Sequence, residues 1–165
     1  PNINLSDVAL DATSKMESSI ADVGYGSASV DADIEWYNRG LSLISENKYR
    51  EALSCLDKAL KVFKDDDDMI IRILNARGNT FYYLEDYPKT IENYHQAMII
   101  NPALVSGRTL YNMGTAYAEM ERYDDAIKCY GQAIPRGLST EESALAKEQT
   151  RRCTQLRKES LRRAI

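Results

Sequence analysis

One pattern of small and large residues recurs three times along the chain. In each copy a glycine follows a large apolar residue by four positions and precedes another large residue by three. These glycines are Gly40, Gly78 and Gly114. A tyrosine, an alanine or threonine, an aromatic residue or leucine, and an alanine then follow at the same intervals in every copy. Because two helices approach closely only where small residues alternate with large ones, the pattern predicts an all-α chain of antiparallel helical hairpins.

The pattern resembles the tetratricopeptide repeat (TPR), a 34-residue unit with Trp, Leu, Gly, Tyr, Ala, Phe, Ala and Pro at fixed positions. The resemblance covers roughly residues 33–138. It implies a right-handed superhelix of helical hairpins, an α-α solenoid, with three repeats at about 33–66, 71–104 and 107–138. Residues 139–165 are then expected to form a basic C-terminal capping helix, and residues 1–32 an acidic N-terminal extension.

Several residues predict where helices begin and end. The run Asp65–Asp68 precedes Met69 and is expected to cap the next helix, whereas a calcium loop would need interleaved glycine and a distal glutamate. Pro88 suits the first turn of a helix. Residues 135–137, Pro-Arg-Gly, should end the third repeat early, and Ser139 with the glutamates after it should open the last helix.

The two ends of the chain differ in charge and leave alternatives open. Between Leu5 and Val23 the apolar residues fall at helical spacing, which predicts a short amphipathic helix. That helix either covers the first repeat or lies in a groove of this molecule or of a neighbouring one. The C-terminal segment carries seven basic residues between Lys147 and Arg163. It is either a solvated cap or a surface for an acidic partner or RNA, and no aromatic residue interleaves it as RNA binding would favour.

The inventory of reactive residues argues against catalysis. His95 is the single histidine, expected on an exposed helix face. Cys55, Cys129 and Cys153 form no CxxC pair, which disfavours a zinc site or a disulfide framework. We therefore expect no enzyme activity and no cofactor.

Charge and hydropathy limit the partners and the cellular compartment that the sequence favours. The formal net charge is −4, so the chain as a whole gives no reason to expect nucleic acid as a partner. No run of about eighteen apolar residues predicts membrane insertion. The start of the chain lacks the pattern of a secretory signal, and the unpaired cysteines fit a reducing compartment, which together predict a cytoplasmic protein.

The family resemblance also implies a binding surface, because the first helix of each TPR hairpin lines a concave groove. Transferring the register of the groove positions gives Tyr37, Asn38, Leu41, Arg72, Asn75, Asn79, Tyr82, Arg108, Tyr111, Asn112 and Thr115. Such a mixture suits a peptide, because Asn bonds backbone groups and Arg pairs with carboxylates. The plainer interpretation is that these are surface residues of a helical stack.

Members of the family that hold acidic chaperone tails use a clamp of Lys, Asn and Arg residues. Here the clamp positions carry Tyr37, Leu41, Ala76, Arg108 and Asn112, so Arg108 alone keeps the basic character. We expect a protein or peptide partner, and an acidic ligand of Arg72 and Arg108 stays open. The alternative is a structural module that self-associates into a homo-oligomer.

Overall fold

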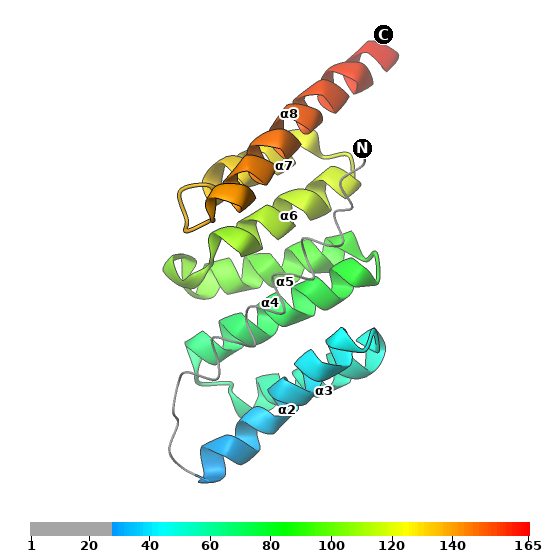
Figure 1. The fold of residues 1–165 in the computed structure, drawn as a ribbon. Coiled ribbons are helices and arrows are strands. Elements are labelled where there is room, and N and C mark those ends of the chain that lie inside the picture. The colour runs from blue at the N-terminus through cyan, green and yellow to red at the C-terminus, as the bar shows by residue number, and fades with distance from the viewer. Residues whose placement is uncertain (1–27) are drawn as a thin grey trace. The chain divides into compact units, whose positions relative to one another are not determined.

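The structure, a computed structural model, describes the backbone of residues 28–165 and the side chains from residue 33 onward. The predicted N-terminal helix between Leu5 and Val23 lies outside the described residues. Within the described part every regular element is helical, which confirms the predicted all-α class (Figure 1). The elements are α2 (Ala28–Ser45), α3 (Tyr49–Val62), α4 (Asp67–Tyr83), α5 (Tyr87–Ile100), η1 (Pro102–Leu104), α6 (Gly107–Glu119), α7 (Tyr123–Ala133) and α8 (Thr140–Arg163).

The chain divides into two compact units, one ending at Pro102 and the other spanning Ala103–Ile165. We call them the N-terminal unit and the C-terminal unit. The N-terminal unit contains the hairpins α2–α3 and α4–α5, with α3 packed on α4 and α2 touching α4. Helix α2 begins at Ala28, inside the segment 1–32 that was expected to precede the first repeat.

Each hairpin is closed by a large side chain of its second helix lying on the glycine of its first. A Cβ added at Gly40 would lie 2.9 Å from Cδ2 of Leu56, and one at Gly78 would lie 2.7 Å from Cδ1 of Tyr94. At Gly114 the added atom would meet Cε1 of the third hairpin's tyrosine, again at 2.9 Å. The recurring glycines are therefore packing positions, as their spacing predicts, and there is no room for a side chain between the helices.

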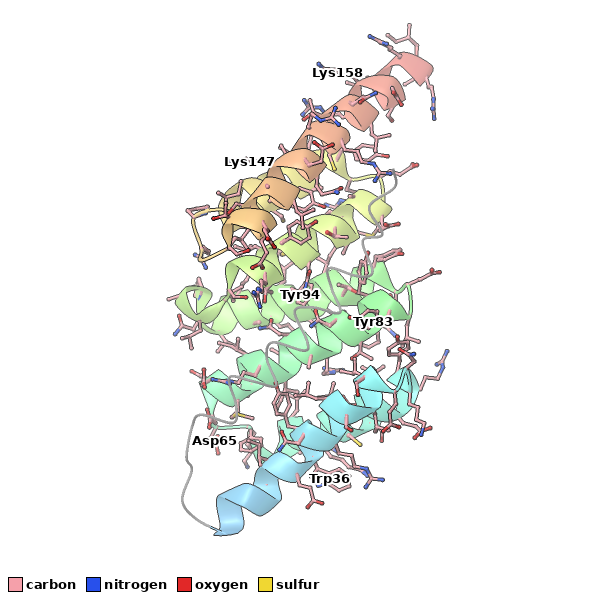
Figure 2. All side chains as sticks on the ribbon, in the orientation of Figure 1. Trp36, Asp65, Tyr83, Tyr94, Lys147 and Lys158 are labelled. Atoms are coloured by element: carbon pink, nitrogen blue, oxygen red, sulfur yellow. The ribbon has the colours of Figure 1, made fainter. Side chains whose placement is uncertain are left out.

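In two hairpins the tyrosine on the glycine also forms a polar contact with the next residue of the first helix. The Tyr94 hydroxyl, labelled in Figure 2, donates to Oδ1 of Asn79. In the third hairpin the hydroxyl of Tyr130 lies 3.2 Å from Oγ1 of Thr115. All four residues are buried, so these contacts satisfy polar groups that burial would otherwise leave unpaired.

The first helix of every hairpin ends in the same turn. Asn47, Glu85 and Glu121 all adopt left-handed backbone conformations, with φ of 62°, 60° and 60°. The amide of the residue after each one bonds back to a carbonyl five positions earlier, as in Lys48 N to Leu43 O at 2.9 Å. This is the hydrogen-bond pattern of a Schellman motif, which satisfies carbonyls at a helix end.

The predicted helix starts are confirmed where a side chain or proline signals them. Asp66 accepts a hydrogen bond from the amide of Met69 and caps α4. Pro88 lies in the first turn of α5. Ser139 and Glu142 form a complete capping box at the start of α8.

The C-terminal unit consists of the hairpin α6–α7 with α8 packed on α7. Helix α7 ends at Ala133, just before Pro135, and has 11 residues against 14 in α3 and in α5. Helix α8 has 24 residues, or about 36 Å of helix, and its buried residues are Ala146, Gln149 and Cys153. All three precede residue 154, so residues 154–163 of α8 contribute no buried residue to the described unit.

Two alanine substitutions in one hairpin test the glycine contact. Gly114→Ala should lower the free energy of unfolding by about 1–3 kcal/mol, because the new methyl group overpacks the Tyr130 ring and the carbonyl of Ala126. Gly131→Ala in α7 should instead raise it by about 0.5–1 kcal/mol, because nothing lies within 4 Å of the added atom. Urea denaturation of both variants measures the difference, and equal effects would contradict the packing role of Gly114.

Candidate functional site

Helix α4 presents four of the predicted groove residues on a single face. Arg72, Asn75, Asn79 and Tyr82 follow one another at intervals of three, four and three, which places them along one stripe of the helix. Arg72 is half-buried and its Nε lies 3.2 Å from Oδ2 of Asp68 on the same helix. The other three side chains of the stripe are buried.

The side-chain amide of Asn75 differs from its neighbours in this stripe in its hydrogen bonding. Its side chain is 8% exposed, and its Oδ1 has no hydrogen-bond partner among the described residues. The neighbouring Asn79 differs, because its Oδ1 accepts from Tyr94. A buried carbonyl oxygen without a partner costs free energy, so a donor that reached Oδ1 of Asn75 would be stabilising.

Helix α2 places its predicted residues differently. Tyr37 and Leu41 belong to the core of the N-terminal unit, where they pack with Ile44, Leu56 and Ile73. Asn38 is exposed. Among the predicted residues of α2, Asn38 is therefore the one whose side chain reaches solvent.

Helix α6 buries its predicted polar residues as well. Tyr111, Asn112 and Thr115 are all buried, and the Tyr111 ring lies 5.2 Å from the ring of Tyr130, centroid to centroid. Burial raises the pKa of Tyr111 to about 12, so its hydroxyl stays protonated at neutral pH. The Thr115 hydroxyl donates to the carbonyl of Tyr111 at 3.1 Å.

Arg108, in the first turn of α6, pairs with a carboxylate whose spacing from Ser139 predicts only a helix cap. Its Nε lies 2.7 Å from Oε2 of Glu142 and its Nη2 lies 3.0 Å from Oε1. This contact lowers the pKa of Glu142 to about 2. The two residues are 34 positions apart, and the capping-box spacing that signals Glu142 gives no indication of its partner on α6.

The residues weighed for chemistry lie apart or are buried. His95 is exposed on α5, and all three cysteines are free and buried. Burial raises the pKa of Cys129 to about 11, which keeps its thiol protonated and a poor nucleophile. The described residues contain no cluster of three or more His, Cys, Asp or Glu suited to a metal ion, and no described helix is long and apolar enough to cross a membrane.

The basic residues of α8 are partly neutralised by ion pairs. Arg151 pairs with Glu148 of the same helix, and Arg157 lies 2.6 Å from a carboxylate oxygen of Asp124 on α7. Lys147 and Lys158, labelled in Figure 2, are exposed in the two halves of the helix.

Comparison with known proteins finds similarity to one repeat family in two parts of the chain. Two family models, both described as "Tetratricopeptide repeat", match residues 34–66 and residues 107–135. A curated relative, the 43 kDa receptor-associated protein of the synapse from Tetronarce californica, is 24% identical over 118 residues. That match covers 64% of this chain, and the chain spans only 28% of the relative's length.

Solved TPR domains have the same fold. The TPR domain of Arabidopsis OM64 aligns with a TM-score of 0.64 at 16% identity, covering 74% of this chain and 96% of that domain. The Sgt2 TPR domain from Aspergillus fumigatus gives 0.64 at 17% identity, covering 79% and 82%. The TPR domain of P58(IPK) gives 0.69 at 19% identity, covering 94% of this chain and 44% of that one.

The pairing of Glu142 predicts a pH dependence of stability. Its pKa is about 2 in the folded chain against an ordinary value of 4.5, so the pair stabilises the fold fully above about pH 4.5. That contribution is lost as the pH falls toward 2. The stability difference between the wild type and Glu142→Gln should therefore shrink over this range in urea titrations. A difference that stays constant from pH 5.5 to pH 2.5 would contradict the pairing.

Proposed function

We propose, on the premise that the chain belongs to the tetratricopeptide repeat family, that it is a protein-interaction module whose first hairpin helices bind a segment of another protein. The curated relative is named for its association with a receptor, which agrees with a protein partner for this chain. The repeats then serve as an adaptor or scaffold and perform no chemistry of their own.

The buried Oδ1 of Asn75 is the observation that carries the proposal. A bound segment in extended conformation offers backbone N–H groups, each of which needs an acceptor once water is excluded. Asn75 supplies an acceptor that no described residue uses. A hydrogen bond from a backbone N–H of the segment to Oδ1 of Asn75 would remove the free-energy cost of leaving these two groups unpaired.

The rest of the α4 stripe suits the same partner. Arg72 keeps part of its side chain exposed and is held by Asp68 only through a contact within its own helix, which is a weak restraint at a surface. Tyr82 contributes a buried ring whose centroid lies 5.5 Å from that of the Tyr87 ring. We therefore expect the segment to run along α4, with Asn75 holding its backbone and Arg72 contacting its side chains.

The other predicted groove residues have smaller roles in the proposed binding. Asn38 offers an exposed amide on α2, while Tyr37 and Leu41 support that helix from the core. On α6 we assign contacts to the face formed by Arg108, Tyr111, Asn112 and Thr115. The three buried free thiols fit a reducing compartment such as the cytoplasm, where we place the protein.

Substitution of Asn75 tests the proposal against a matched control in the same hairpin. Peptides would be selected from a phage-displayed library on the full chain, and their affinities measured by fluorescence anisotropy. Asn75→Ala should weaken binding by roughly 5- to 150-fold, because loss of one buried acceptor costs about 1–3 kcal/mol. Asn93→Ala should leave the affinity within about twofold. Asn93 is 5% exposed and its Oδ1 is also unpartnered among the described residues, but it lies on α5, the second helix.

Two outcomes would contradict the proposal. Equal losses for both variants would show that the buried amides act through folding rather than through contact with the peptide. If no peptide is selected and light scattering gives a multiple of 18.7 kDa, self-association is the better account of the surface.

A further inference from the structure

The carboxylate of Glu142 is fully engaged by groups of its own unit. Its Oε2 accepts from Nε of Arg108 at 2.7 Å, and its Oε1 accepts from Nη2 at 3.0 Å and from the amide of Ser139 at 3.3 Å. The amide of Glu142 in turn donates to Oγ of Ser139 at 3.1 Å. Ser139, the N-cap of α8, thus bonds both the backbone and the carboxylate of Glu142, and the carboxylate meets Arg108 of α6 in a bidentate geometry, the arrangement in which Arg binds a carboxylate best.

The arginine at the equivalent position of α4 pairs with a different kind of partner. Arg72 and Arg108 both lie six residues before the glycine of their hairpin. Arg72 has an acid four residues before it, Asp68, which is 53% exposed and makes one contact. Arg108 has Leu104 at that place, so no acid lies four residues before it. An acid of α8 pairs with the Arg108 guanidinium instead, although α7 separates the two helices in the sequence.

The α6–α8 pair is also more enclosed than the other ion pairs of the described chain. The Glu142 side chain is 19% exposed, whereas the acids in the other pairs are at least 38% exposed. The pair between Glu148 and Arg151 shows the contrast, because it has the same two-contact form but lies within one helix and in solvent. A carboxylate held and partly dehydrated in this way is a stronger competitor than a mobile surface acid.

We propose that Glu142 is a built-in carboxylate ligand of Arg108, which makes this part of α6 select a partner segment without a carboxylate at the position of contact. The inference rests on the proposed function and names the chemistry of the partner at this point: neutral, with its own hydrogen-bonding groups. An acidic segment binds Arg108 only by displacing Glu142. Lowering the pH within the physiological range does not break the pair between Arg108 and Glu142, because Glu142 stays ionised to about pH 2.

The variant Glu142→Gln removes the internal carboxylate and keeps the helix start, because glutamine also serves in a capping box. Acetate is the first probe, followed through the Nε–H signal of Arg108 in nitrogen-15 NMR spectra of the full chain. We expect acetate to shift this signal in Glu142→Gln at a concentration at least tenfold below that needed for the wild type. Glu148→Gln, which removes a surface carboxylate of the same helix, should behave as the wild type.

The second probe is a selected peptide prepared with either a free carboxylate or an amide at its C-terminus. The wild type should bind both forms within about twofold, whereas Glu142→Gln should favour the carboxylate by at least fivefold. Equal acetate responses of the wild type and Glu142→Gln would overturn the inference, and so would a wild type that already prefers the carboxylate. If neither protein binds any peptide while the acetate responses differ as expected, the proposed function fails and the occupancy of Arg108 stands.

Discussion

In each hairpin the glycine of the first helix lies against a large side chain of the second. Gly40 receives Leu56, Gly78 receives Tyr94 and Gly114 receives Tyr130, and in each case an added methyl group would lie within van der Waals distance of that side chain. This contact fixes how near the two helices lie and how they are rotated about their axes. The positions of the other first-helix residues relative to the second helix, including the stripe on α4, follow from that rotation.

The hairpins and several of their ends could be predicted because their signals are local or periodic. The glycine spacing, the cap at Asp66, the proline at 88 and the capping box at Ser139 all act within one helix or one hairpin. The start of α2 at Ala28 was not foreseen, because that segment carries no part of the repeat pattern. The left-handed residues were missed as well, since two of the three are glutamates, which do not signal this conformation.

The candidate surface was harder to predict than the fold, because a register assigns a residue to a face without saying what else that residue touches. Asn79 and Thr115 were expected to contact a ligand, yet each already has a polar contact with the tyrosine of its hairpin. The sequence leaves an acidic ligand of Arg108 open, and in the structure an acid 34 residues away engages the guanidinium. Both contacts depend on helices being brought together, so neither leaves a pattern in the sequence.

The tyrosines on the glycines have a consequence for how the hairpins move. A tyrosine ring can rotate by half a turn only when its neighbours make way, and these rings lie against helix backbone on one side with their hydroxyls held on the other. Each half-turn of Tyr94 or Tyr130 therefore requires the two helices to part briefly, whereas the hydroxyl oxygen lies on the axis of rotation and keeps its place beside Asn79 or Thr115. The rate at which the two ring edges exchange can be measured from NMR line shapes. It reports how often a single hairpin opens. The first hairpin has a leucine at this place, so no tyrosine ring reports its opening.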